Sequence, residues 1–216
     1  MRIPDPPLLI VTDRRQARRP LPDIVAAAVK AGCRWISVRE KDLPADELVL
    51  LTRSLIPITH ARGARLTVHG DAELAAAAGV DGVHLPAGSD PAAARALLGA
   101  QKLIGVSIHT VPEAERIDAS SVDYVVAGPA FETMSKPGYG PELGRKGVAA
   151  IARVARVPVL AIGGVNTARV AELIAAGAAG VGVMGGVMRA ADPEREVAAL
   201  IATLVGSPAI RARDTC

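Results

Sequence analysis

The feature that most constrains the fold lies between residues 157 and 187, where two short apolar runs each end in a pair of glycines. The runs, 158–162 and 181–184, do not alternate with polar residues, which is typical of strands buried on both faces. Gly163 and Gly164 follow the first run, and Gly185 and Gly186 follow the second. Glycines leave backbone N–H groups uncovered, so both pairs can donate to one anion. We expect a phosphate site there, with two ordinary tight turns as the simpler alternative.

Six further strand–helix units precede this stretch. Strands are expected at 8–13, 34–38, 65–68, 81–85, 102–106 and 121–127, with helical segments such as 21–31 and 44–62 between them. Polar clusters follow the strands and not the helices, which predicts an α/β fold, a (β/α)₈ TIM barrel. The loops after the last two strands of such barrels commonly bind phosphate. We expect one domain over residues 1–216, with a core from about 8 to 205 and a short basic C-terminal tail.

Composition excludes several classes of function. The chain has 25 basic and 22 acidic residues, and an aromatic content of 2% leaves little for stacking on bases, so we expect no nucleic acid partner. No apolar run approaches the roughly 20 residues of a membrane span and no signal peptide opens the chain, so we expect a cytoplasmic protein without a membrane partner. Cys33 and Cys216 stand in unrelated contexts, which predicts neither a disulfide framework nor a metal cluster. The oligomeric state stays open, with a homo-oligomer among the alternatives.

The polar residues that follow the strands form the candidate site. The barrel fold predicts that they meet in one bowl at the carboxyl ends of the strands. Besides the four glycines, this set comprises Asp13, Arg39, Lys41, His69, Ser107, His109, Thr133, Ser135 and Lys136. Arg39 and Lys41 suit a phosphate or diphosphate, although solvated surface charge is the alternative.

His109 is the candidate for proton transfer. A histidine titrates near neutrality and can both accept and donate a proton, but a lone histidine is more often structural. His109 follows a strand end and faces the predicted phosphate site, which favours chemistry. His69 can line the bowl in either role, whereas His84 lies within a strand and is expected to be structural.

The loop after the sixth strand reads FETMSKPGYGPELG. Thr133, Ser135 and Lys136 supply two hydroxyls and a cation, which suit an anionic group. Its prolines and glycines oppose a helix and favour a flap over the bowl. An ordinary surface connection is the alternative.

Seven segments carry a resemblance to a known family. VTDR, VREKD, GVHL, IGVSIHT, DYVVAGPAFETMSKPG, PVLAIGGV and GVGVMGGV, in this order, resemble the thiamine phosphate synthase and thiazole tautomerase family over roughly residues 8 to 205. The resemblance implies a (β/α)₈ barrel, a thiazole phosphate held by the two glycine loops, and a role in making or salvaging vitamin B1. Gly185 stands where the family often has serine, so one hydroxyl is missing from the phosphate site.

The synthases join a hydroxymethylpyrimidine diphosphate to a thiazole phosphate, and the resemblance implies two aspartates that hold Mg²⁺ against the diphosphate. Gly70 and Ser89 stand at these positions, with Asp71 and Asp90 one place further on. A hard cation with two phosphates needs such oxygens. Ser37 also replaces a glutamine that is usual in the synthases.

The tautomerases resemble the chain in LPxGS at 85–89 and in the FET that opens the loop after the sixth strand. They isomerise a carboxythiazole phosphate, which needs one histidine and neither metal nor diphosphate. Arg39 and Lys41 nevertheless match the synthase diphosphate pocket. The sequence therefore predicts first a tautomerase without a cofactor, acting through His109 on a small phosphorylated thiazole. The alternatives are a thiamine phosphate synthase with Mg²⁺ and a non-catalytic thiazole phosphate-binding or regulatory protein.

Overall fold

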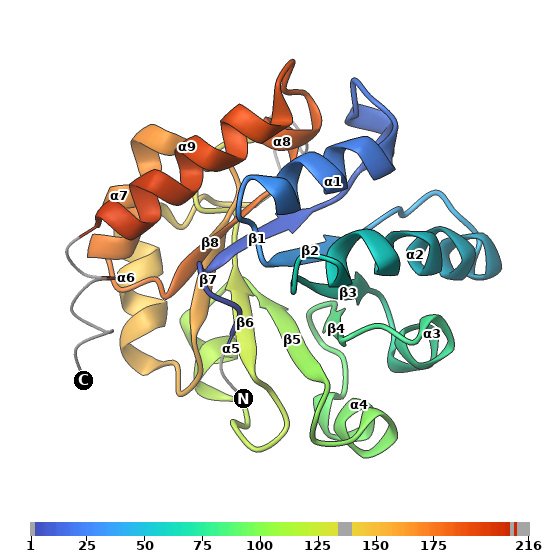
Figure 1. Cartoon of the computed structure of the whole chain (residues 1–216). Coiled ribbons are helices and arrows are strands. Elements are labelled where there is room, and N and C mark those ends of the chain that lie inside the picture. Colours follow the sequence, from blue (N-terminus) through green and yellow to red (C-terminus); the bar gives the residue numbers. More distant parts are fainter. Residues whose placement is uncertain (1–2, 134–139, 208–209, 211–216) are drawn as a thin grey trace.

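The fold is a closed barrel of parallel strands, each paired with the next and the last paired with the first (Figure 1). The computed structural model describes residues 3–133, 140–207 and 210, so the predicted site residues Ser135 and Lys136 lie outside the described residues. The strands are β1 (Leu8–Val11), β2 (Trp35–Val38), β3 (Arg65–His69), β4 (Gly82–Leu85), β5 (Leu103–Ile108), β6 (Tyr124–Ala127), β7 (Val159–Ile162) and β8 (Gly180–Val183). The predicted (β/α)₈ architecture is confirmed.

Helices surround this barrel on the outside (Figure 1). They are the 3₁₀ helix η1 (Arg14–Gln16) and the α-helices α1 (Leu21–Lys30), α2 (Ala45–His60), α3 (Ala72–Ala78), α4 (Pro91–Leu98), α5 (Val111–Glu115), α6 (Gly144–Val154), α7 (Thr167–Ala175), α8 (Gly185–Met188) and α9 (Pro193–Gly206). Side-chain caps start five of the α-helices, because a short polar side chain accepts hydrogen bonds from backbone N–H groups of the first turn. These caps are Asp71, Asp90, Thr110, Asn166 and Asp192.

Two strands extend further toward the bowl than the sequence predicted. β5 reaches Ile108 and β3 reaches His69. Ser107 and His69 are therefore strand residues, not loop residues, and their backbones are held by the sheet. Parallel pairing with neighbouring strands outweighs the polar character of these residues, since Ser107 pairs with Val126 and His69 with His84.

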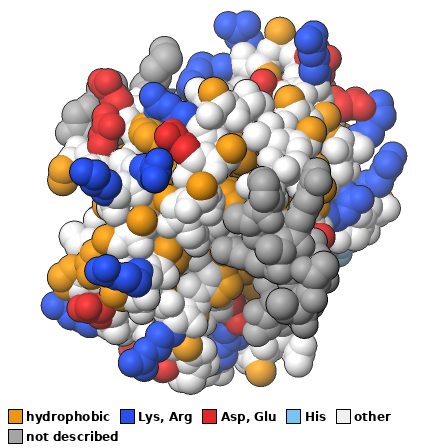
Figure 2. All heavy atoms as spheres, turned by 90° about the vertical axis from the view of Figure 1, so that its left-hand side faces the viewer, with side chains coloured by type: hydrophobic (Ala, Val, Ile, Leu, Met, Phe, Trp, Pro, Cys, Tyr) orange, Lys and Arg blue, Asp and Glu red, His pale blue; other side chains and the backbone are white. Residues whose placement is uncertain are grey.

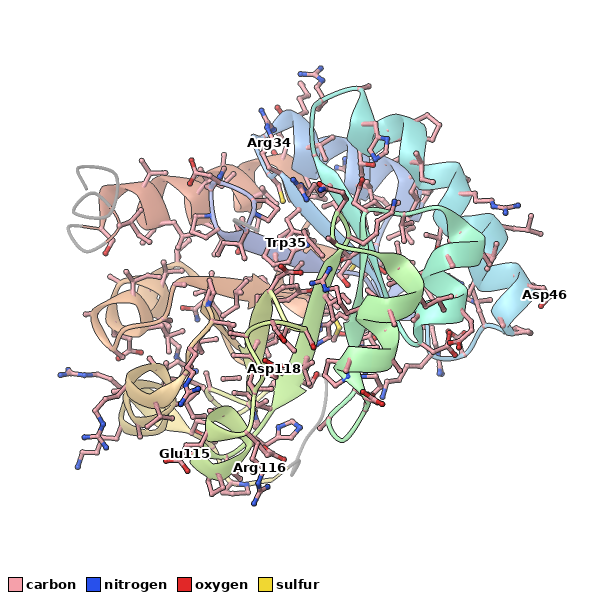
Figure 3. All side chains as sticks on the ribbon, turned by 90° about the horizontal axis from the view of Figure 1, so that it is seen from below. Arg34, Trp35, Asp46, Glu115, Arg116 and Asp118 are labelled. Carbon is pink, nitrogen blue, oxygen red and sulfur yellow. The ribbon has the colours of Figure 1, made fainter. Side chains whose placement is uncertain are left out.

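Side chains alternate between the barrel interior and the layer beneath the helices. The interior holds Trp35 and Tyr124, whose rings meet edge to face with centroids 4.6 Å apart. Gly105 of β5 is needed for this packing, because a Cβ at that position would lie 2.0 Å from the Tyr124 ring. Figure 3 shows Trp35 among the strands, whereas Asp46, Glu115 and Arg116 lie at the edge of the molecule.

The outer surface mixes charges of both signs. Figure 2 shows one face, on which Lys and Arg side chains are interspersed with Asp and Glu. In the part of the chain that the structure describes, no helix is both long and apolar enough to cross a membrane.

Candidate active site

A buried carboxylate, Glu40, joins the ends of the first two strands beneath the rim of the barrel. It is 2% exposed. Its Oε1 accepts a 2.6 Å hydrogen bond from the Thr12 hydroxyl, and its Oε2 accepts one of 2.8 Å from the backbone N–H of Arg14. The Thr12 Oγ1 in turn accepts a 3.0 Å hydrogen bond from the backbone N–H of Arg39. We did not predict this role from the sequence, although a carboxylate directly after a buried strand was a signal for it.

Arg39 and Lys41 place two positive charges close together at the rim. Nη1 of Arg39 lies 3.9 Å from Sδ of Met184, the residue that follows β8. Burial lowers the pKa of Arg39, and the carboxylates of Asp13 and Glu40 oppose this shift. The charge of Arg39 lowers the pKa of Lys41, with a further contribution from burial. The predicted binding of a phosphate or diphosphate by these two cations stays a prediction.

The two glycine pairs lie at the ends of neighbouring strands, as predicted. β7 and β8 pair directly. Gly163 and Gly164 have φ values of +101° and +63°, which glycine adopts without strain. Gly185 and Gly186 are the first two residues of α8, and the first N–H groups of a helix have no acceptor within it. Their convergence on one phosphate stays a prediction.

The start of the loop after β6 packs along the first glycine pair. The backbone N–H of Phe131 donates a 3.1 Å hydrogen bond to the carbonyl of Gly163. Cζ of Arg169 lies 4.1 Å from the centroid of the Phe131 ring, and its Nη1 donates a 3.2 Å hydrogen bond to the carbonyl of Gly164. Thr133 follows two residues after Phe131. The root of the predicted flap is thus fixed beside the candidate phosphate site.

His109 is held by both its ring and its main chain. Nδ1 lies 2.5 Å from the carbonyl oxygen of Gly128, which can only accept a hydrogen bond, so the neutral ring carries its proton on Nδ1. The backbone N–H donates a 2.6 Å hydrogen bond to Glu113, which forms a capping box with Thr110 at the start of α5. The lone pair of the neutral imidazole is therefore on Nε2, where it can accept a proton.

His84 lies under the rim and contacts a candidate site residue. Its Nε2 is 2.9 Å from Oγ of Ser107, and its ring centroid is 5.1 Å from that of His69. Burial lowers the pKa of His84 well below its ordinary value, with smaller contributions from the charges of His69 and Arg39. His84 is thus a neutral link between the barrel interior and the bowl. The sequence did not reveal this contact, although period-two alternation in β4 directs His84 inward.

The positions at which the resemblance implies metal-binding carboxylates do not provide them. Gly70 has no side chain, and Oγ of Ser89 donates a 2.9 Å hydrogen bond to a backbone carbonyl. Oδ1 of Asp71 caps α3 and Oδ1 of Asp90 caps α4, so each adjacent carboxylate has a structural role. Among the described residues, no group of three or more His, Cys, Asp or Glu side chains is arranged to hold a metal. The side chains at these positions do not fit Mg²⁺ held in the manner of the synthases.

A hollow of about 390 Å³ lies between the β4–α4 loop and α5, and Ser89 and Asp90 are among the residues that line it. Val106 and Ile108, which pack with the layer beneath the helices, form its floor. Ser107 is the only predicted site residue among those that line it in the described part of the chain.

Comparison with known proteins identifies the family. A sequence profile described as thiamine monophosphate synthase matches residues 8–187, well over half of the chain. The chain belongs to the thiamine monophosphate synthase family. Within this family, a protein of Roseiflexus sp. (strain RS-1) named thiamine-phosphate synthase is 42% identical over 206 residues, covering 94% of this chain and 87% of the relative. A protein of the same name from Chlorobium luteolum is 37% identical over 207 residues, covering 94% and 96%.

Solved structures agree with the family. The thiamine phosphate pyrophosphorylase of Pyrococcus furiosus matches with a TM-score of 0.82 and 28% identity, covering 92% of this chain and 95% of that one. A 3-hexulose-6-phosphate synthase matches with a TM-score of 0.67 at 20% identity, covering 91% and 98%, and supports the fold alone. The resemblance found in the sequence is confirmed, and the named relatives favour the activity that the sequence ranked second.

Proposed function

We propose that the protein is a thiamine-phosphate synthase, which joins hydroxymethylpyrimidine diphosphate to a thiazole phosphate. The observation that carries the proposal is the position of Arg39, whose guanidinium contacts Met184 next to the glycine loop after β8. A paired cation site for a diphosphate therefore borders a glycine site for a monophosphate. The names of the relatives support the same activity. A tautomerase, which handles one phosphate, has no need for the paired cations.

The chemistry is a substitution at the pyrimidine methylene carbon. The bond from this carbon to the diphosphate oxygen breaks, and the electron pair leaves with the diphosphate. The thiazole nitrogen donates its lone pair to the same carbon, which forms the new C–N bond. Arg39 and Lys41 stabilise the charge that develops on the leaving diphosphate. The glycine loops hold the thiazole phosphate so that its nitrogen is oriented toward the methylene carbon, which lowers the entropic cost of the reaction.

The family implies Mg²⁺ at the diphosphate, and the side chains here do not fit it in that manner. Gly70 and Ser89 lack carboxylates, and Asp71 and Asp90 cap helices. The backbone of Arg39 is held by Thr12, which in turn is held by Glu40, and we propose that the Arg39 guanidinium binds the diphosphate.

The second candidate is the thiazole tautomerase that the sequence ranked first. Two observations favour it: the absent carboxylates at positions 70 and 89, and the Nε2 lone pair of His109. The comparisons support the synthase better, because the named relatives are synthases.

A turnover assay with both substrate sets tests the proposal. Purified protein is given the pyrimidine diphosphate and thiazole phosphate, or the carboxythiazole phosphate alone, each with Mg²⁺ and with EDTA. We expect thiamine phosphate from the first set at a rate well above that of isomerisation. Isomerisation without any thiamine phosphate would refute the proposal in favour of the tautomerase.

A further inference from the structure

Arg189 turns its side chain back over the start of α8. A Cβ built on Gly185 would lie 2.4 Å from Nη1, 2.6 Å from Nη2 and 2.7 Å from Cζ of Arg189. The guanidinium therefore occupies the space that a side chain at position 185 would fill. The resemblance implies a serine at this position in many members of the family, and the glycine here leaves room for the guanidinium.

No carboxylate of the described residues forms an ion pair with Arg189. Its Nη1 donates to Oε1 of Gln16, a neutral amide, and Nε2 of Gln16 donates a 2.5 Å hydrogen bond to Asp13. Arg189 is partly buried. A charge that is partly removed from water and lacks a counter-ion favours the binding of an anion.

The surroundings of Arg189 indicate which anion. Gly185 and Gly186 are the first residues of α8, shortly after β8. Arg39 contacts Met184, the residue directly before Gly185. A guanidinium presents several N–H donors in a plane, which match the oxygens of a phosphate. A hydroxyl at position 185 would supply one neutral donor at the same place.

We infer that Arg189 binds the phosphate of the thiazole substrate and replaces the side-chain hydroxyl that Gly185 lacks. The inference rests on the proposed function, whose monophosphate site it completes. Under this inference, Arg189 determines the affinity for the phosphate. It also explains how position 185, where the resemblance implies a serine, can be a glycine in this chain. The competing role for Arg189 is structural, a tie between α8 and η1 through Gln16.

Calorimetry with 4-methyl-5-(2-phosphonooxyethyl)thiazole, and with the corresponding alcohol as the probe without phosphate, tests the inference. Arg189→Ala should weaken binding of the phosphate by about 10- to 100-fold, as expected for charge-assisted hydrogen bonds. The same variant should bind the alcohol as the parent does. Arg195→Ala removes an equal charge from an exposed position of α9 and should stay within about twofold of the parent.

The double variant Gly185→Ser/Arg189→Ala separates phosphate binding from a structural tie. A serine regains a hydroxyl at the vacated place, so the double variant should bind the thiazole phosphate more tightly than Arg189→Ala, whereas a lost tie to Gln16 would not be repaired. The inference would be overturned if Arg189→Ala bound the thiazole phosphate as tightly as the parent, or if the double variant bound it no more tightly than Arg189→Ala. The proposed function would still stand if the parent makes thiamine phosphate. A parent that neither binds the thiazole phosphate nor makes thiamine phosphate would refute the proposed function, and the inference with it.

Discussion

The imidazole of His84 and the hydroxyl of Ser107 meet at 2.9 Å across adjacent strands, which connects the barrel interior to the floor of the bowl. The ring stacks on Tyr124, with centroids 5.6 Å apart, and burial keeps it uncharged. Protonation would place a charge among apolar side chains and beside His69. The protein thus gains a neutral polar contact under its candidate site at the cost of sensitivity to acid.

This sensitivity gives a prediction for the free energy of unfolding. The pKa of His84 is lower in the folded than in the unfolded state, so between these two values the unfolded state binds more protons. Stability from the neutral ring is complete above an unfolded pKa of about 6.5 and falls as the pH drops below it. We expect His84→Gln to flatten the stability profile below about pH 6.5, measured by urea denaturation. The parent protein, measured over the same pH range, is the reference; an unchanged slope in His84→Gln would contradict the assignment.

Glu40 should support both the fold and the diphosphate site. Glu40→Gln leaves one acceptor oxygen for two buried donors, the Thr12 hydroxyl and the Arg14 N–H, so we expect a loss of about 2–3 kcal/mol in the free energy of unfolding. The backbone of Arg39 is then less well fixed, and KM for the pyrimidine diphosphate should rise more than KM for the thiazole phosphate. Denaturation and steady-state kinetics check both effects. Glu115→Gln, at an exposed carboxylate, should change neither quantity, and equal rises of the two KM values would argue against a local role for Glu40.

Gly164 should be required because it has no side chain, as well as for its backbone N–H group. A Cβ there would lie 2.5 Å from the carbonyl oxygen of Glu132, at a φ of +63°. We expect Gly164→Ala to lower the free energy of unfolding by about 1–3 kcal/mol and to weaken thiazole phosphate binding. Gly79→Ala is a matched control, since Gly79 has a φ of +73° and no atom within 4 Å of its Cβ position. Gly79→Ala should cost about 1 kcal/mol and leave binding unchanged; equal effects on binding would remove Gly164 from the site.

The sequence predicted the barrel because buried parallel strands are uniformly apolar and glycine pairs mark their ends. It also predicted which strand ends bear the candidate site. It could not predict Glu40, because a carboxylate in a charged run looks solvated until its partners, Thr12 and Arg14, are known to lie in the segment that follows β1. The sequence could not predict the guanidinium of Arg189 over Gly185 either, because its position depends on a side-chain conformation and not on sequence spacing. Ser135 and Lys136 stay predictions.

The two absent carboxylates predict how the affinity for Mg²⁺ can be raised. A Cβ at Gly70 would find Leu74 Cδ1 at 3.9 Å, so the position accepts a side chain without strain. Gly70→Asp/Ser89→Asp should add two oxygen ligands beside the diphosphate pocket and lower the half-saturating Mg²⁺ concentration for thiamine phosphate formation by about tenfold. Magnesium titration of the parent and variant measures this. Asp71→Asn/Asp90→Asn should have the same half-saturating Mg²⁺ concentration as the parent. A tenfold higher concentration in that variant would mean that the two capping aspartates also bind the metal.

His109 separates the two candidate reactions, because only one of them needs a proton carrier. Substitution at the methylene carbon transfers no proton to or from the reacting atoms, so His109→Asn should reduce kcat for thiamine phosphate formation by less than about tenfold. Isomerisation of the carboxythiazole phosphate moves a proton, and loss of a general acid–base group typically lowers such a rate by about 10²- to 10⁴-fold. The parent should also incorporate solvent deuterium into the product of any isomerisation it performs, whereas the variant should not. Rates of both reactions in the parent and in His109→Asn decide the matter. A loss of 10²-fold or more in the synthase reaction, with binding of both substrates retained, would assign His109 a part in that chemistry that substitution alone does not require.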